Sequence, residues 1–165
     1  MLSGAKHPPK SNMEKLPNSR NCFACGMENP IGLKLEMYGD PKTGVVTCDY
    51  LIPKHFEGYP GIAHGGIVSS LLDEVISRVY MVGDHNRFMY TARLTSRFRK
   101  HVPVEVPLHM TGEFVRDRGR TAEAEAKIFA PDGELLAEGQ ALLVDAGEMG
   151  KEHLDELGWK VYADN

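Results

Sequence analysis

The sequence of 165 residues has no long apolar segment. No run of about 18 apolar residues occurs, so a membrane-spanning helix is not predicted. The first twenty residues also contain no apolar stretch of about seven residues or more, which the core of an export signal would need. We therefore expect a soluble protein that stays in the cytoplasm and has no membrane partner.

Cysteine is scarce, with only Cys22, Cys25 and Cys48. Three is an odd number, which fits a reducing compartment better than a disulfide framework. Cys22 and Cys25 have the spacing of zinc ligands, but a structural zinc site needs about four ligands and no second Cys-x-x-Cys motif exists. From the sequence we expect no bound metal.

The chain also lacks a concentrated positive charge. It has 19 basic and 23 acidic residues, a formal net charge of −4, and its basic residues are scattered or in short groups. A protein that binds nucleic acid usually gathers its basic residues on one face to match the phosphate backbone. The sequence therefore predicts no nucleic-acid partner.

The length is enough for one well-buried core and too short for two ordinary domains. Residues 1–20 are polar, contain Pro8-Pro9 and show no hydrophobic period, so we expect a flexible N-terminal tail. We place one domain at residues 21–145 and a charged C-terminal tail at residues 146–165.

The hydrophobic pattern of residues 21–145 predicts six strands and one long helix. Apolar and polar residues alternate at residues 33–37, and residues 45–52 are rich in β-branched and aromatic residues. Thr121–Lys127 is included because it also alternates, although it is built of helix formers. Apolar residues from Ile67 to Val79 instead follow the stripe of a helix with one wide buried face. The order predicts an α+β layer with the helix on one face of an antiparallel sheet. The expected strands cover residues 33–37, 45–52, 90–102, 104–115, 121–129 and 135–144.

The expected helix carries short polar residues on its other face, among them Asp73 and Glu74. His64-Gly65-Gly66 precedes it, and the N-terminus of a helix offers unpaired N–H groups and a positive dipole end that can polarise a carbonyl oxygen. Asp73 lies about 10 Å along the axis from Gly66, so the two groups reach different parts of one ligand. A second subunit could bring them together.

Ala63-His64-Gly65-Gly66, followed by Asp73 nine residues after the histidine, resembles the motif of hotdog-fold acyl-CoA thioesterases of the phenylacetate-degradation type. The likeness extends to Asn21–Gly26, a Cys-Phe-x-Cys-Gly entry, and covers about residues 21–144. It implies a hotdog fold, a six-stranded sheet wrapped around the helix. It also implies a homodimer or a homotetramer built as a dimer of dimers, with active sites at the protomer interface.

The resemblance assigns roles to single residues. Asp73 takes the place of the catalytic carboxylate, acting as general base on water or as nucleophile. Gly65 and Gly66 take the place of the backbone donors to the thioester oxygen, and His64 shapes their loop or donates near the carbonyl. Thr91 matches a hydroxyl that orients the attacking water. Glu74 is kept as a second candidate carboxylate, although adjacent helix residues diverge by about 100°.

Basic residues after the strand at residue 90 correspond to groups that contact coenzyme A in relatives, which assigns Arg97, Arg99 and Lys100 to the phosphates. One position departs from the pattern. Some relatives carry an amide side chain six residues before the histidine, where this chain has Gly58. Any contact of that amide with the substrate is missing here or comes from elsewhere.

The sequence thus predicts hydrolysis of an acyl-CoA thioester to a carboxylic acid and free coenzyme A, with coenzyme A as part of the substrate and no separate cofactor. Two alternatives stay open. A non-catalytic hotdog module would hold an acyl-CoA or acyl-carrier ligand, and a hotdog hydratase or dehydratase would place an acid–base pair about the acyl double bond. Acyl-chain preference cannot be read, although Met27, Met81 and Phe88 are candidates to line an acyl pocket.

Overall fold

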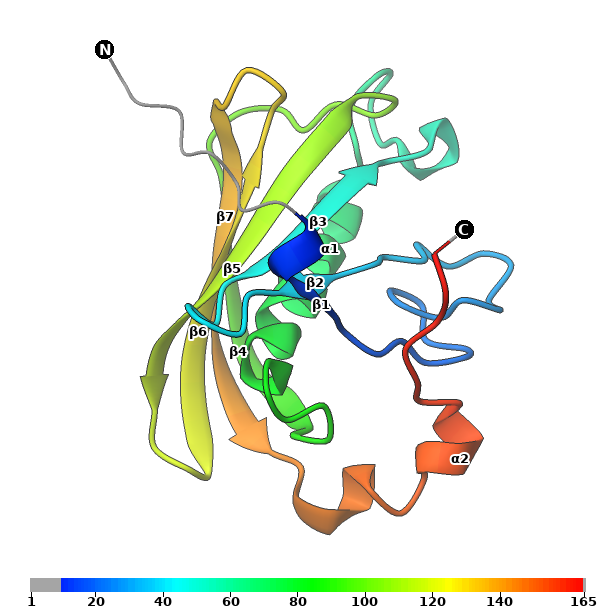
Figure 1. Ribbon diagram of the computed structural model, residues 1–165. Coiled ribbons are helices and arrows are strands. Elements are labelled where there is room, and N and C mark those ends of the chain that lie inside the picture. The colour runs from blue at the N-terminus through cyan, green and yellow to red at the C-terminus, as the bar shows by residue number, and fades with distance from the viewer. Residues whose placement is uncertain (1–9, 165) are drawn as a thin grey trace.

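The computed structural model describes residues 10–164, which form one antiparallel sheet with a long helix against one face (Figure 1). The sheet has seven strands in the order β1-β2-β3-β5-β6-β7-β4. The α+β class and the long helix are as predicted, whereas the predicted count of six strands is wrong because two short strands near the N-terminus pair at one edge. The strands are β1 (Glu14–Lys15), β2 (Tyr38–Gly39), β3 (Val46–Leu51), β4 (Met89–Phe98), β5 (Pro107–Asp117), β6 (Thr121–Phe129) and β7 (Leu135–Asp145); the helices are α1 (Gly65–Arg78) and α2 (Leu154–Leu157).

Helix α1 forms where the apolar stripe predicted it. His64 caps its N-terminus, and a short 3-10 turn over Val79–Met81 ends it before Gly83, whose φ of +81° favours glycine. The apolar side of the helix is fully covered by the sheet, since its aliphatic residues are almost without solvent exposure. These buried residues are Val68, Leu71, Leu72, Val75 and Ile76.

The helix lies so close to the sheet that side chains must be small at the contact. A Cβ added to Gly112 of β5 would lie 2.8 Å from Val75 Cγ1 and 3.1 Å from the Val75 carbonyl oxygen. Strand β6 presents alanines to the same side, which keeps its inner surface shallow. The central helix therefore packs directly on the backbone of the sheet.

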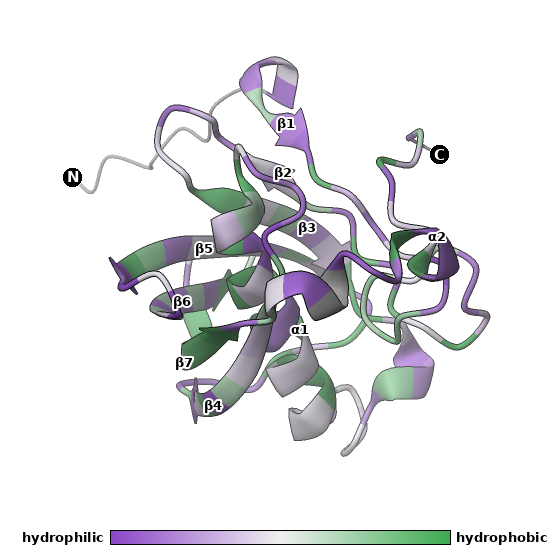
Figure 2. Cartoon of the chain, turned by 90° about the horizontal axis from the view of Figure 1, so that it is seen from below, coloured by the Kyte–Doolittle hydropathy of each residue, from purple (hydrophilic) through white to green (hydrophobic). Residues whose placement is uncertain are grey.

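Strand β6 forms as its alternating pattern predicts, although several of its residues favour a helix. Its residues alternate between half-buried and buried along the whole strand, and purple and green bands follow each other along it in Figure 2. Thr121–Lys127 consists of good helix formers, but both neighbours, β5 and β7, pair with it in register. Tertiary pairing overrides the helical preference here.

The first predicted strand is wrong. Residues 33–37 are extended but leave the sheet, because Lys34 adopts a φ of +56° and breaks the ladder. The Leu33 and Leu35 amides donate to the carbonyls of Phe23 and Ala24, each about 3 Å away, instead of to a strand. Only Tyr38–Gly39 pairs with β3.

Part of the predicted N-terminal tail is also folded. Residues 14–20 cross the molecule, Leu16 is fully buried, and Asn18 is 1% exposed. The Asn18 amide donates to the carbonyls of Cys25 and Leu35, which ties this segment to the next two. The expected boundary at residue 20 therefore lies too far along the chain. Residues 1–9 lie outside the described part.

The C-terminal segment packs on the same side of the molecule as the N-terminal one (Figure 1). Trp159 donates its indole N–H to the His85 carbonyl at 2.9 Å, and Asn18 bridges to Lys160. Helix α1 thus lies between the sheet and the two terminal segments. The segment predicted as a charged tail at 146–165 is packed against the rest of the fold as far as residue 164. The predicted strand at 104–115 begins at Pro107, since proline is tolerated at a first strand position.

Within residues 10–164, no helix is long and apolar enough to cross a membrane.

Candidate active site

Asp73 and Thr91 meet at the open edge of the sheet. Thr91 Oγ1 of β4 donates to Asp73 Oδ1 of α1 at 2.7 Å. Burial raises the pKa of the Asp73 carboxyl, the hydrogen bond from Thr91 offsets part of that rise, and the charge of Glu74 adds to it. A half-buried carboxylate held by a hydroxyl, with a raised pKa, has the properties of a general base or nucleophile.

The polar face of α1 follows strand β4 along its length. Ser69 and Ser96 hydroxyls lie 3.1 Å apart, between the Asp73–Thr91 pair and the N-terminus of the helix. At that N-terminus, a Cβ added to Gly65 would lie 3.7 Å from Phe98 Cζ. The short serines predicted on this face therefore let the helix lie against the edge strand.

The His64 loop presents one backbone donor rather than the predicted two. The Gly66 N–H donates to His64 Nδ1 at 2.9 Å, so it is used as the helix cap. Among residues 10–164 the Gly65 N–H has no acceptor, and Gly65 is exposed at the positive end of the helix dipole. Because Nδ1 accepts this bond, a neutral His64 carries its proton on Nε2 and can donate from there.

Glu74 faces a different environment from Asp73. Its Oε1 accepts hydrogen bonds from both Nε and Nη2 of Arg78, one turn further along α1. Arg78 is 2% exposed, and its guanidinium also donates to the Pro17 carbonyl and lies over the Trp159 ring. Glu74 is therefore the counterion of a buried arginine, and the geometry favours Asp73 as the reactive carboxylate.

Gly58, the position that departs from the family pattern, lies beside the loop histidine. A Cβ added there would lie 3.4 Å from His64 Cα and 3.6 Å from its ring carbon Cδ2, which is ordinary contact. The structure therefore puts position 58 next to the loop but supplies no amide there.

The predicted phosphate-binding residues gather at the end of β4, near the N-terminus of α1. Arg99 pairs with Glu138 at 2.7 Å, Arg97 reaches the same carboxylate at 4.0 Å, and Lys100 lies 3.4 Å from Glu134. All three cationic side chains are well exposed. They form an exposed positive group whose charge is partly offset by two carboxylates.

A pocket of about 530 Å³ lies between the C-terminal half of α1, the start of β4 and the two terminal segments. Ser77 and Tyr90 line it, one helical turn from Asp73 and one residue from Thr91. Its remaining walls are mostly apolar and come largely from the terminal segments. These lining residues include Met81, Phe88, Met89, Ala146, Leu157 and Trp159. Met81 and Phe88 were predicted to line such a pocket; Met27 instead contacts the Asn18 amide.

Cys22 and Cys25 lie in the wall of this pocket together with Glu74. Hydrogen bonding between the two thiols lowers the pKa of Cys22 to about 6 and, with burial, raises the pKa of Cys25. The sequence showed the pair but not its neighbour Glu74, since they are about fifty residues apart and only the folded chain brings them together.

Comparison with known proteins finds a family match in the centre of the chain. Residues 60–137 match the family described as Thioesterase superfamily. They include the His64 loop, all of α1 and β4, and therefore the whole Asp73–Thr91 site.

Two curated relatives carry acyl-CoA thioesterase names. The acyl-coenzyme A thioesterase THEM4 of Xenopus laevis is 25% identical over 83% of this chain and 60% of its own length. The human acyl-coenzyme A thioesterase THEM5 is 27% identical over 45% of this chain and 29% of its own length. This chain therefore spans less than two thirds of either relative.

Solved structures share the fold. A thioesterase superfamily protein, RHA08564, superposes with a TM-score of 0.69 and 28% identity, over 76% of this chain and 61% of its own. The E. coli PaaI protein of the phenylacetic acid degradation operon reaches a TM-score of 0.62 at 14% identity, over 70% and 81% of the two chains. The hotdog architecture is thus confirmed, while closeness to the phenylacetate-degradation type stays a prediction.

Proposed function

We propose that this chain hydrolyses an acyl-CoA thioester to a carboxylic acid and free coenzyme A. The observation that carries the proposal is the Asp73–Thr91 pair, a half-buried carboxylate with a raised pKa at 2.7 Å from a hydroxyl. In this scheme the Gly65 amide and the helix dipole stabilise the oxyanion, while Asp73 deprotonates water or attacks the carbonyl itself. The acyl-CoA thioesterase names of both relatives support the reaction class.

We infer that a complete site needs two protomers. Gly65 and Asp73 are eight residues apart on one helix, so about 12 Å of axis separates them, too far for one carbonyl to reach both. Strand β4 is ten residues long and pairs only with β7 among residues 10–164, which leaves its outer edge available for a second copy.

The register along β4 supports that arrangement. Gly65 lies beside Phe98, and Asp73 lies beside Thr91 on the same strand. If two β4 strands pair antiparallel about a two-fold axis midway between these positions, Phe98 lies opposite the partner's Thr91. The Gly65 amide then approaches the partner's Asp73, so each dimer holds two composite sites.

We further infer that the apolar pocket beside Ser77 and Tyr90 takes the acyl group and that Arg97, Arg99 and Lys100 meet the coenzyme A phosphates. Apolar walls that begin one turn from Asp73 suit an acyl chain. Two structures of similar fold are described with acetyl-CoA and with coenzyme A bound, at 19% and 21% identity. They support coenzyme A as the carrier.

Thiol release from short, long and aromatic acyl-CoAs tests the proposal, with the native chain and Asp73→Asn compared at equal folded concentration. We expect turnover by the native chain and a collapse of turnover in the variant, whose amide keeps the shape of the carboxylate and can still accept from Thr91. Full hydrolysis by Asp73→Asn and Asp73→Ala would remove the assignment. Tight acyl-CoA binding without turnover by the native chain would favour a binding module, and hydration of crotonyl-CoA would favour a hydratase.

A further inference from the structure

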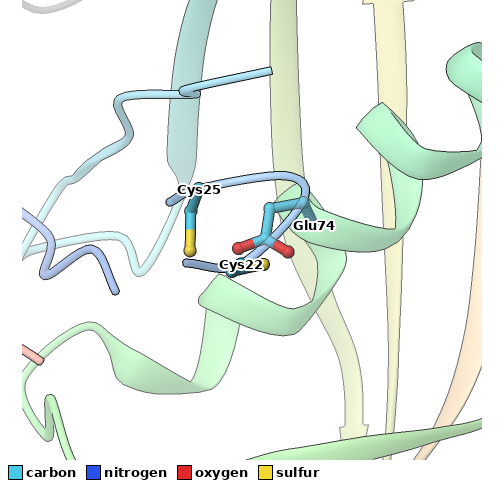
Figure 3. A group of neighbouring side chains, drawn as sticks. All are labelled: Cys22, Cys25 and Glu74. Carbon is cyan, nitrogen blue, oxygen red and sulfur yellow. The ribbon is translucent and has the colours of Figure 1, made fainter. Parts of the chain in front are cut away.

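Three metal-binding groups converge beside α1, away from the Asp73–Thr91 pair. Cys22 Sγ, Cys25 Sγ and a carboxylate oxygen of Glu74 all lie within 4.8 Å of one another, and Figure 3 shows the side chains gathered around a common point. In a tetrahedral zinc site the zinc–sulfur distance is about 2.3 Å, which puts two sulfurs about 3.8 Å apart. The three groups therefore need to close by only about 1 Å to share an ion.

The cysteine turn is built to hold thiolates. The Gly26 N–H donates to the Cys22 carbonyl at 2.8 Å, which closes the turn, and the Ala24 N–H donates to Cys22 Sγ at 3.3 Å. A Cβ at Gly26 would lie 2.3 Å from the Cys22 carbonyl oxygen, so only glycine fits there. The Ser19 hydroxyl lies 3.5 Å from Cys25 Sγ. The Ala24 amide aimed at Cys22 Sγ favours the deprotonated form of that thiol, which is the form that binds metals.

Glu74 is oriented for a second contact. Arg78 uses only Oε1 of this carboxylate, which leaves Oε2 for another partner. The positive charge of the buried Arg78 guanidinium is already balanced by Glu74. The charge of a divalent cation would be balanced by the two thiolates. Exchanging two thiol protons for one divalent cation leaves the net charge of this buried group unchanged.

We propose that Cys22, Cys25 and Glu74 form a binding site for a thiophilic divalent cation of the zinc class. Binding replaces the two thiol protons, which leave to solvent, with two metal–sulfur bonds and one metal–oxygen bond. The fourth coordination position is left to water from the adjoining pocket, which all three residues line. Metal binding at this site can be tested whether or not the chain hydrolyses thioesters. It revises the expectation of no metal, which rested on the absence of further ligands close in sequence.

The ion would act as a clamp. Cys22 and Cys25 lie in the N-terminal segment, outside residues 60–137, whereas Glu74 is on α1 next to Asp73. A bound ion therefore cross-links that segment to the helix and fixes one wall of the pocket. Because the ion binds only the folded chain, the free energy of unfolding rises with the logarithm of the free-metal concentration once that concentration exceeds Kd.

Cobalt(II) titration of the full chain tests the site. The protein is reduced, freed of reductant without air, and titrated with cobalt chloride. We expect one equivalent to bind, with an intense sulfur-to-cobalt charge-transfer band in the near ultraviolet and visible bands of tetrahedral cobalt. Zinc chloride should abolish both. The bands should vanish in Cys22→Ser and Cys25→Ser and persist in Cys48→Ser, the matched control, since Cys48 lies in β3 outside the cluster.

Glu74→Gln tests the third ligand, and we expect it to weaken cobalt binding by more than the roughly 10- to 100-fold loss typical of a supporting residue. Glu74→Gln could unfold because Arg78 loses its counterion. In that case Cys22→Ser still tests the site, because Cys22 is exposed and its replacement leaves the Glu74–Arg78 ion pair intact. A reduced native chain without the charge-transfer band overturns the proposal. A charge-transfer band of equal intensity in Cys22→Ser also overturns it. So does a chain that is recovered with a Cys22–Cys25 disulfide and binds no cobalt after that disulfide is reduced.

Discussion

Replacing Gly65 with proline should remove the proposed oxyanion donor without disturbing the fold. Gly65 is the first residue of α1, a position where proline is well tolerated because its missing N–H would be unpaired in any case. His64 has φ −59° and ψ 136°, which is the extended conformation that a residue before proline prefers. The nearest atom to an added Cβ is Phe98 Cζ at 3.7 Å, so the ring has room.

Gly65→Pro should lower kcat and slightly raise the free energy of unfolding. Losing one oxyanion donor lowers kcat by about 100- to 1000-fold, equivalent to about 2.7–4 kcal/mol of transition-state stabilisation. Proline at a compatible position stabilises a fold by about 0.4–1 kcal/mol, because it restricts the unfolded chain. Gly65→Pro should therefore be nearly inactive and at least as stable as the native chain. Gly65→Ala keeps the N–H and should stay within a few-fold of native activity.

The assay is release of coenzyme A, measured chromatographically so that reactive protein thiols do not interfere, together with a urea unfolding curve for each variant. Equal hydrolysis by Gly65→Pro and Gly65→Ala, with both fully folded, would refute the role of this amide. Mixing Gly65→Pro with Asp73→Asn after dissociation tests the two-protomer site. Random reassociation should restore up to about a quarter of native activity, because half of the dimers then hold one intact site. No recovery from confirmed mixed dimers would place both groups in one protomer's site.

Three further results are expected. Thr91→Val removes a hydrogen bond that lowers the pKa of Asp73, so the acid limb of the pH profile of kcat/KM should move to higher pH. Thr91→Ser keeps a hydroxyl and should leave the acid limb in place. A shift of the acid limb to lower pH in Thr91→Val would contradict the assignment. Gly112→Ala should cost about 1–3 kcal/mol in urea unfolding, because the new methyl meets Val75 at 2.8 Å. Trp159→Ala enlarges the apolar pocket and should shift the acyl-CoA preference toward bulkier acyl groups with little change in the turnover of short ones.

The long elements could be predicted because their patterns are strong and local. The apolar stripe gave α1 almost to the residue, and alternation identified β6 against its helix-forming composition. Residues 33–37 misled because their alternation reflects burial against the N-terminal segment, residues 16–24, rather than pairing in the sheet. A residue in the left-handed backbone conformation, such as Lys34, cannot be recognised from the hydrophobic pattern of the sequence.

The site was predictable in its residues and less so in its contacts. Asp73 and Thr91 were each assigned a role from a resemblance, but the hydrogen bond between them was not predicted, since eighteen residues separate the partners. Spacing alone did not predict that His64 would engage the Gly66 amide and leave Gly65 as the donor. Glu74 beside Cys22 and Cys25 could not be predicted at all, because that contact depends on how the N-terminal segment returns to the helix.

Adjacent carboxylates on α1 thus serve two surfaces. Asp73 turns to the edge strand within the segment that matches the thioesterase superfamily, whereas Glu74 turns to a pocket of which half the lining residues lie outside that segment. A helix rotates by about 100° per residue, so changes around Glu74 can alter the pocket without reorienting Asp73. Differences between this chain and its relatives in acyl preference should therefore arise mainly from residues 10–26 and 146–164, which wall the pocket, rather than from the catalytic pair.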